Sequence, residues 1–275
     1  MKRIGIVYHP LNKGALDLAR KVAGILGSVD VNCWSCSAWE GQQLSKQVTD
    51  TDLILTVGGD GTILRTAQAL VSYSIPIIGI NMGKLGFLTE LTASEAVDKL
   101  PALLAGGGWI DERAMLEVRL ESRQKKRDQK FLVLNDVVIA RGEIARIIYI
   151  EAEIDDEPLT TYKADGVIVA TATGSTGYAL ACGGPILHPQ AVQFLLAPIV
   201  PHLSLNNTLV LPSETKVKLR VGPIHKAVLS VDGHISIPLD SNESITVKHS
   251  RLATRFLRTS TRDSFYSMLE RKLKG

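Results

Sequence analysis

The sequence predicts an α/β domain built on a parallel sheet, followed by a β-rich domain. Short apolar runs alternate with segments of helical periodicity as far as the glycines at residues 106–108. Beyond them, apolar and charged side chains alternate every second residue, which is typical of half-buried strands. We therefore expect an α/β domain at residues 1–108, a β-rich domain at residues 109–250, and a helical segment at residues 251–275 that returns to the first domain.

Composition limits the classes of function. The chain has 275 residues, 45% of them hydrophobic, which suits one large domain or two small ones with a packed core. Its 31 Lys and Arg residues against 28 Asp and Glu give a net charge of +3, so neither a nucleic acid nor a membrane surface is required as a partner. No stretch reaches the ~18 apolar residues of a membrane span, and the start lacks a signal-peptide core. We expect a soluble, cytoplasmic protein.

The cysteines do not indicate a disulfide framework, since the chain has only three of them. Cys33 and Cys36 have the spacing of a metal-binding or redox pair. They lie in a predicted strand, however, where an odd separation sends the two side chains to opposite faces. We therefore expect no metal site here.

Strands and helices alternate in the first domain. Such alternation implies a parallel sheet covered by helices on both faces, and ligands of such sheets lie beyond the carboxyl ends of the strands. The predicted strands cover residues 3–9, 31–35, 53–57 and 77–80. The predicted helices cover residues 16–26, a polar stretch up to residue 48, residues 62–71, and the stretch from Ser94 to the glycines at 106–108. Gly27 would be the C-terminal cap of the first helix, and Glu95 lies in the first turn of the last.

A glycine-rich loop, Gly-Gly-Asp-Gly-Thr at residues 58–62, follows the apolar run at 53–57 directly. Glycine backbone N–H groups and the positive end of the next helix favour an anion there. Asp60 is the unusual member, because a carboxylate beside phosphate is repulsive unless it binds a metal, accepts a proton or hydrogen-bonds a hydroxyl. The loop is consistent with chemistry on a phosphate, or with a tight turn in which Asp60 caps the helix. A second glycine-bearing loop at residues 81–89 should face it across the sheet.

The second domain reads as a series of short strands. The charged run at residues 125–128 is typical of a solvated hairpin tip rather than a phosphate-binding patch. Residues 155–158 predict a turn, and Asp232 with Gly233 is a hairpin signal. The predicted strands are residues 116–120, 131–140, 146–154, 167–170, 208–211, 217–221, 227–231, 235–238 and 244–248.

Two polar stretches of the second domain suit ligand recognition. Residues 171–178 combine four hydroxyl side chains with glycines and end in Tyr178, which suits the ribose, phosphate and base of a nucleotide. The alternative is a flexible Ser/Thr/Gly linker, although the apolar strand before the run and the Gly-Gly-Pro at 183–185 argue for an ordered loop. Asn135 and Asp136 interrupt an otherwise apolar strand. They would bind a ligand hydroxyl or amide, or form an Asx turn.

These stretches together resemble the NAD kinase family, in matching order and spacing over nearly the whole chain. The resemblance lies in residues 58–62, 81–90, 135–136, 165–166 and 173–185. The Gly-Gly-Asp-Gly element also occurs in phosphofructokinases and in diacylglycerol and sphingoid-base kinases, whereas the Thr-Gly-Ser-Thr-Gly-Tyr run with the Asn-Asp pair is more specific.

The resemblance implies a Rossmann-like first domain, a β-sandwich-like second domain, and an NAD site between them. It implies transfer of the terminal phosphoryl group of ATP or inorganic polyphosphate to the 2′-hydroxyl of the adenosine ribose of NAD. Mg²⁺, or another divalent metal, would be held through the donor phosphates. The resemblance further suggests a homodimer or homotetramer.

Carried over position by position, the resemblance makes Asp60 the catalytic base. Arg65 would reach phosphate, and Phe87 would line the adenine site. Asn135 and Asp136 would bind the other nucleoside half, although many members have Asn-Glu there. The complete implied nucleotide site is Gly58, Gly59, Gly61, Thr62, Arg65, Phe87, Asn135, Asp136, Arg146, Lys163, Asp165, Thr173, Thr176, Gly177, Tyr178, Ala179, Leu180, Ala181 and His234, the last standing where relatives often carry Gln.

Two other functions remain as alternatives at this stage. A diacylglycerol- or sphingoid-type lipid kinase would need an extended apolar acceptor pocket, which the hydroxyl-rich residues 171–176 disfavour. A dinucleotide-binding regulator without turnover would keep the same site, because Asp60 would then only bind ribose. Formation of NADP from Mg-ATP and NAD separates the three.

Overall fold

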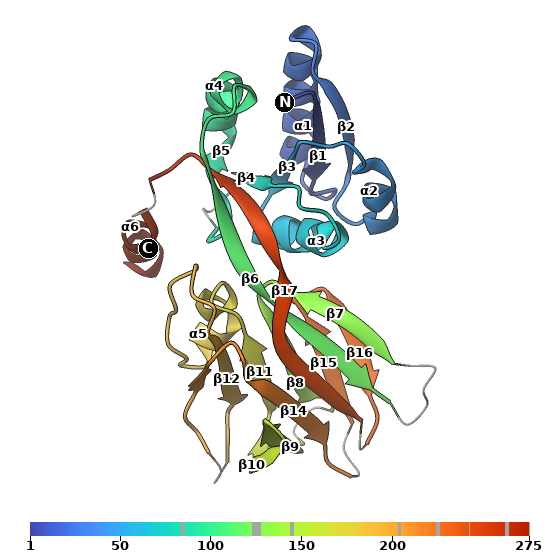
Figure 1. Ribbon diagram of the computed structural model, residues 1–275, viewed down its shortest axis with the longest axis vertical. Coiled ribbons are helices and arrows are strands. Elements are labelled where there is room, and N and C mark those ends of the chain that lie inside the picture. Colours follow the sequence, from blue (N-terminus) through green and yellow to red (C-terminus); the bar gives the residue numbers. More distant parts are fainter. Residues whose placement is uncertain are drawn as a thin grey trace. The chain divides into compact units, whose positions relative to one another are not determined.

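The computed structural model describes residues 1–83, 86–122, 128–143, 146–202, 205–223, 226–241, 243–261 and 264–274. The chain divides into two compact units, Met1–Glu112 with Thr254–Gly275, and Arg113–Ala253. Both boundaries fall inside long strands, β6 (Trp109–Glu121) and β17 (Ser244–Arg258) (Figure 1). Among the described residues, no helix has the length and apolar character needed to cross a bilayer.

The first unit is built on a parallel sheet with strand order β2-β1-β3-β4. Every residue of β3 and β4 is buried, as expected of central strands covered on both faces (Figure 1). The end of β17 adds to the sheet beside β4, with Phe256 opposite Ile77. The elements are β1 (Arg3–Tyr8), α1 (Lys13–Ser28), β2 (Asn32–Ser37), α2 (Gly41–Gln47), β3 (Leu53–Gly58), α3 (Asp60–Leu70), β4 (Ile77–Asn81), β5 (Leu91–Thr92), α4 (Ala93–Leu104) and, after β17, α6 (Ser264–Lys274).

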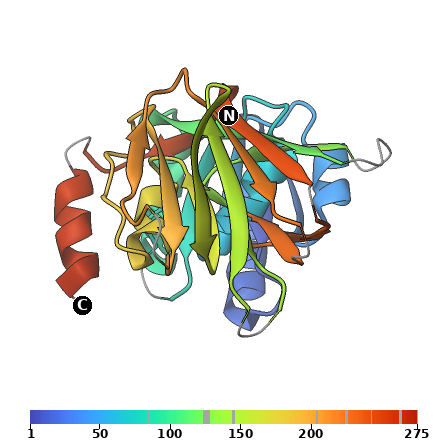
Figure 2. The same ribbon diagram turned by 90° about the horizontal axis from the view of Figure 1, so that it is seen from below.

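The second unit is a β-sandwich in the part that the structure describes. One sheet has the order β10-β9-β14-β17-β6-β7 and the other β13-β12-β11-β8-β15-β16, and their inner side chains form one apolar core (Figures 1 and 2). The predicted α/β plus β-rich fold is therefore confirmed. The remaining elements are β7 (Gln129–Val133), β8 (Asp136–Arg141), β9 (Ile148–Ile154), β10 (Glu157–Ala164), β11 (Gly166–Ala170), the 3-10 turn η2 (Gly174–Thr176), α5 (Tyr178–Ala181), β12 (Phe194–Ile199), β13 (Leu209–Leu211), β14 (Lys216–Val221), β15 (Ala227–Val231) and β16 (Ile235–Leu239).

The ends of two helices differ from the prediction. Gly27 lies inside α1, and the left-handed residue that ends the helix is Asp30, with φ 55°. Aspartate tolerates this conformation better than most residues, so the helix continues past the glycine. Helix α4 is capped by Thr92, whose side chain accepts from the backbone of Glu95, so Ser94 is an internal residue.

The strands differ from the prediction in three further respects. Residues 131–140 form two strands, because the chain breaks between β7 and β8 at the Asn-Asp pair. Strands β10 and β12 were not predicted. Strand β12 is uniformly apolar, contains Pro198 and shows no alternation of apolar and polar residues. Residues 251–258 are part of β17, so helical structure begins only at α6. The charged run at residues 125–127 lies outside the described residues.

Candidate functional site

The glycine loop of the first unit borders a cavity of about 450 Å³. It lies where β3 ends and α3 begins, at the carboxyl end of the parallel sheet, as predicted. An added Cβ at Gly58 would collide with the Thr62 side chain, so this close turn requires glycine. The lining residues are His9, Asn12, Trp39, Gly58, Gly59, Gly61, Thr62, Arg65, Asn81, Met82 and Gly83.

The polar groups of this cavity suit an anion. Gly59 is the N-cap of α3 and offers no side-chain cap, so the helix end can accept a phosphate. The Arg65 guanidinium lies 5.7 Å from the centroid of the Trp39 ring. His9 meets the same ring edge-on, and its buried Nδ1 has no hydrogen-bond partner within the described part of the chain. Trp39 and His9 were not predicted, because neither belongs to a recognisable motif.

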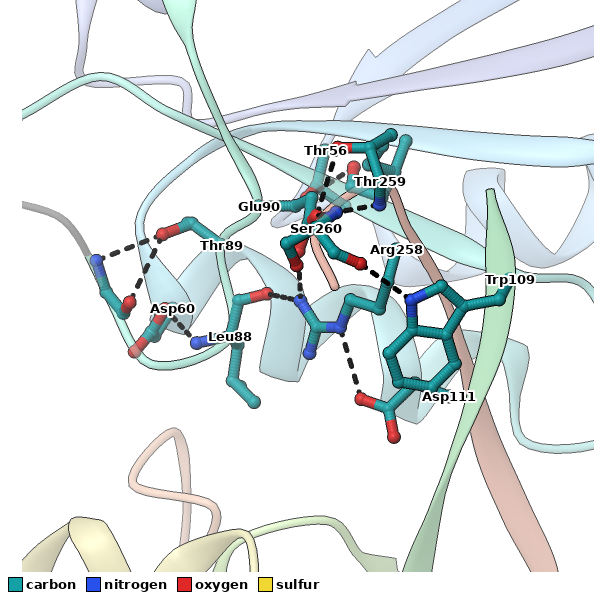
Figure 3. Close-up of polar contacts among 12 residues, drawn as sticks. Thr56, Asp60, Leu88, Thr89, Glu90, Trp109, Asp111, Arg258, Thr259 and Ser260 are labelled. Atoms are coloured by element: carbon teal, nitrogen blue, oxygen red, sulfur yellow. Dashed lines mark hydrogen bonds and ion pairs between the residues drawn. The ribbon is translucent and has the colours of Figure 1, made fainter. Parts of the chain in front are cut away.

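Asp60 does not cap α3. Its Oδ1 accepts the Leu88 N–H at 3.0 Å (Figure 3). Its Oδ2 accepts the Phe87 N–H at 2.7 Å. An added Cβ at Gly86 would collide with the carboxylate. The two glycine-bearing loops therefore face one another, as predicted, and Asp60 joins them. The bonds also fix the orientation of the carboxylate.

A buried ion cluster braces the segment that Asp60 binds. Arg258 donates through Nη1 to the Leu88 carbonyl at 2.9 Å and through Nε to Asp111 at 3.1 Å, and it pairs with Glu90 at 3.3 Å (Figure 3). Burial acts to raise the pKa of Glu90, but backbone N–H bonds and the Arg258 charge outweigh it and hold that pKa below its usual value. The cluster was not predicted, because its members are brought together only by the fold.

In the second unit, Asp232 organises the Asn-Asp pair. Its carboxylate accepts the backbone N–H groups of Leu134 at 3.0 Å, Asn135 at 2.7 Å and Asp136 at 3.2 Å. These bonds replace strand pairing and explain the break between β7 and β8. The described residues offer no hydrogen-bond partner to the buried Asn135 Oδ1, and His234 Nδ1 lies 3.0 Å from the Asp232 carbonyl. Sequence analysis identified Asp232 only as a hairpin residue.

The hydroxyl-rich loop packs directly against this pair. An added Cβ at Gly174 would collide with the Asn135 carbonyl, and one at Gly177 would lie 3.7 Å from Asp136 Oδ2. Thr173 accepts from the buried Arg113 at 3.4 Å, and Thr176 donates to the Thr173 carbonyl at 3.2 Å. The loop is ordered, so the linker alternative is wrong.

Helix α5 completes this loop and carries its exposed ring. Ala179 is fully buried, and Leu180 and Ala181 continue the short helix. The Tyr178 ring is 47% exposed, and burial, followed by the charges of Cys182, Asp165 and Asp136, raises its pKa. An exposed aromatic face beside the Asn-Asp pair is suited to stacking on a base.

The other predicted polar residues have partners of their own. Arg146 pairs with Glu143 at 3.2 Å and its side chain is 77% exposed. Lys163 Nζ lies 5.9 Å from the Tyr149 ring centroid, and Asp165 pairs with Arg141 at 3.4 Å. The charge of Asp165 thus acts on Tyr178, whereas Arg146 and Lys163 contact side chains outside the predicted site. On β2, Cys33 is exposed and Cys36 is buried, as their odd spacing predicted.

Asp136 should make stability fall as the pH rises. Burial, and next the Asp232 charge, raise the pKa of Asp136 from 3.8 to about 7. An acid whose pKa is raised by folding stabilises the folded state fully below the unfolded pKa, and this contribution is lost as the pH rises through the folded pKa. The shift corresponds to about 4 kcal/mol. Urea unfolding between about pH 4 and pH 8 should show this decline, and Asp136→Asn should remove it. An identical pH dependence in both proteins would contradict the assignment.

Comparison with known proteins gives one consistent result. Residues 27–108 match the model of the ATP-NAD kinase N-terminal domain, and residues 134–259 match that of the ATP-NAD kinase C-terminal domain. An NAD kinase of Dehalococcoides mccartyi is 48% identical over 274 residues, which cover 100% of this chain and 96% of the relative. An NAD kinase of Chloroflexus aurantiacus is 37% identical, with 100% and 99% covered.

Solved structures agree with the sequence relatives. Yeast NADH kinase complexed with NADH matches with a TM-score of 0.88 and 25% identity, covering 100% of this chain and 88% of that one. An NAD kinase from Archaeoglobus fulgidus in complex with ATP matches with a TM-score of 0.78 and 27% identity, covering 99% and 98%. These matches favour neither the lipid-kinase nor the non-catalytic alternative. The chain belongs to the NAD kinase family and catalyses the phosphorylation of NAD to NADP.

Proposed function

We propose that the glycine-loop cavity binds the phosphates of ATP and that Asp60 is the general base for the 2′-hydroxyl of the adenosine ribose. The observation that carries this proposal is the position of Asp60. Its carboxylate lies at the first residue of α3, beside a cavity lined by glycines and Arg65, and its orientation is fixed by two backbone N–H bonds. A base next to a phosphate site is the arrangement that phosphoryl transfer to an alcohol requires.

The carboxylate retains acceptor capacity for the substrate. Each carboxylate oxygen has two lone-pair directions, so Asp60 can accept the ribose O2′–H while it keeps its bonds to Phe87 and Leu88. Arg65 and the N-terminus of α3 would hold the donor phosphates in line with that oxygen. Most of the catalytic effect then comes from positioning and from stabilisation of phosphate charge.

The Asn-Asp pair and the loop of residues 173–181 would bind the second nucleoside of NAD. The buried Asn135 Oδ1 has no partner among the described residues, so a hydroxyl or amide donor of the ligand would satisfy it. Tyr178 would stack on a base, and His234 would lie near the Asn-Asp pair through its contact with Asp232.

A divalent metal, proposed as Mg²⁺, fits an arrangement in which the donor phosphates hold it. Among the described residues, no group of three or more His, Cys, Asp or Glu side chains is placed to hold a metal ion. The cavity lining contains no carboxylate, so phosphate oxygens and water would be the ligands. The ion would screen phosphate charge, while Arg65 and the loop orient the donor.

We also propose that the enzyme acts in the cytoplasm, where NAD and ATP are available, as a homodimer or homotetramer. Light scattering coupled to gel filtration measures the assembly, and a monomer at all concentrations would overturn this part of the proposal.

Replacing Arg65 with methionine should raise the KM for ATP by about tenfold to a hundredfold, because a charge-assisted contact to phosphate is lost. The KM for NAD should change little. Arg20→Met is the matched control, since Arg20 is 72% exposed on α1 and pairs only weakly with Asp17 at 3.9 Å. Initial rates with a coupled dehydrogenase measure both constants. Equal KM values for ATP in all three proteins would contradict the placement of the donor.

The function itself is tested by incubating the protein with Mg-ATP and NAD and detecting NADP with an NADP-specific dehydrogenase. We expect NADP and ADP in equal amounts. ATP consumption without NADP, or NAD binding without turnover, would overturn the proposal. Parallel reactions with polyphosphate as donor and NADH as acceptor define the two substrate preferences.

A further inference from the structure

Lys272 of the C-terminal helix α6 has a buried ammonium nitrogen, for which the described residues provide no hydrogen-bond partner. Its Nζ lies 3.8 Å from the centroid of the Phe87 ring, and that nitrogen is fully buried. Removing an ammonium group from water is unfavourable unless an anion or several acceptors replace the water. The contact with the ring face recovers only part of that loss. Among the described residues, the ammonium group therefore keeps donor capacity for an anionic ligand.

The surroundings of Lys272 indicate where that ligand would lie. Phe87, whose ring lies under Nζ, is the residue whose backbone N–H donates to Asp60. Within the part of the chain that the structure describes, the charges that affect Lys272 are those of Asp60, of opposite sign, and of Arg258 and Arg271, of like sign. Arg258 is already paired with Asp111 and Glu90. Lys272 and Asp60 thus both contact Phe87, Lys272 at the ring and Asp60 at the backbone N–H.

The ammonium group is charged under ordinary conditions. Burial lowers the pKa of Lys272 to about 8, an effect that Asp60 opposes and the two arginines reinforce. At neutral pH most molecules therefore still carry the proton. A bound phosphate would stabilise the charged form further.

We propose that Lys272 binds the phosphoryl group during its transfer and afterwards holds the 2′-phosphate of NADP. This rests on the proposed function, which places the 2′-hydroxyl of the adenosine ribose at Asp60, next to Phe87. In the transfer step the O2′–P bond forms and the bond between the γ-phosphorus and the β–γ bridging oxygen breaks. The hydroxyl proton goes to Asp60, and the bridging oxygen leaves with ADP.

An ammonium group is needed at this point for an electrostatic reason. The arriving phosphoryl group brings negative charge to a place where Asp60 already carries one, and the two repel each other. Glycine N–H groups and Arg65 line the donor cavity, but Lys272 is the cation that contacts the Phe87 ring itself. The attraction between the ammonium group and the phosphoryl group grows as that group is transferred to the ribose. This attraction favours the transition state and the product over NAD.

The test is the affinity for NADP compared with the affinity for NAD, measured by calorimetry without ATP. Methionine is slightly shorter than lysine but has a similar helix propensity, and its thioether can contact the Phe87 ring, so α6 can remain docked in Lys272→Met. We expect the Kd for NADP to rise about tenfold to a hundredfold and the Kd for NAD to change less than about threefold. Lys272→Arg should restore most of the NADP affinity.

Arg271→Met is the matched control, since it removes a neighbouring exposed cation from the same helix. It should leave both Kd values unchanged. Parallel losses of NAD and NADP affinity in Lys272→Met, or no loss of either, would show that Lys272 only docks the helix and would overturn the proposal. Thermal unfolding confirms that the variants are folded.

The outcome for Lys272 can be separated from that for Asp60. If Asp60→Asn keeps the parental kcat while Lys272→Met selectively loses affinity for NADP, Asp60 is not the general base, but Lys272 still binds the phosphate. If Asp60→Asn is inactive and Lys272→Met binds NADP normally, only the role of Lys272 is overturned.

Discussion

Replacing Asp60 with asparagine is expected to lower kcat by about a hundredfold to ten-thousandfold, because the amide cannot take the proton of the ribose hydroxyl. The KM for NAD should change much less. The substitution nearly keeps the shape of the side chain. Its amide nitrogen cannot accept a hydrogen bond, however, so one of the Phe87 and Leu88 N–H groups loses its partner.

Thr89→Val separates the base from this second effect. The Thr89 hydroxyl accepts the Gly86 N–H at 3.0 Å, so the variant loosens the same segment and leaves the carboxylate in place. We expect it to keep kcat within about tenfold of the parental value, since one hydrogen bond is worth about 1 kcal/mol. Steady-state rates measure both variants. A parental rate in Asp60→Asn, or an equal loss in Thr89→Val, would contradict general-base catalysis by Asp60.

Replacing Asp232 with alanine should have the largest effect on stability. The carboxylate is buried and accepts three backbone N–H groups, all of which would lose their acceptor. At about 1–3 kcal/mol for each unsatisfied donor, we expect a loss of about 3 kcal/mol or more in the free energy of unfolding. Removing the Asp232 charge should also lower the pKa of Asp136, because that charge contributes to raising it.

The control for Asp232 is Asp156→Ala, on an exposed turn. Asp156 pairs with Lys216 at 2.6 Å, but its side chain is 73% exposed, so its loss should cost less than about 1 kcal/mol. Urea unfolding followed by circular dichroism gives both values. Equal stabilities of the two variants would show that the Asn-Asp segment does not depend on Asp232.

Local sequence patterns predicted the parts of the fold that local chemistry determines. Alternating strands and helices, the glycine loop after β3 and the ordered hydroxyl-rich loop are each encoded within a few consecutive residues. Fold and family followed from these patterns and their order. The two loops at the carboxyl ends of β3 and β4 face one another because parallel strands end at the same edge of the sheet.

What escaped prediction depends on contacts between distant parts of the chain. The break between β7 and β8 is caused by Asp232, and strand β17 extends to Arg258 because it finds an edge beside β4. Periodicity cannot reveal such partners. Arg258 and Lys272 lie in a stretch whose sequence is compatible with a plain amphipathic helix, yet the structure brings both to the Phe87–Leu88 segment.

A crystal structure of the protein with NAD tests the central claim most directly, through the distance between the Asp60 carboxylate and O2′ of the adenosine ribose. We expect one carboxylate oxygen to lie about 2.6–3.2 Å from that atom. A ribose bound beyond this reach, with Asp60 bonded only to the Phe87 and Leu88 N–H groups, would contradict the account.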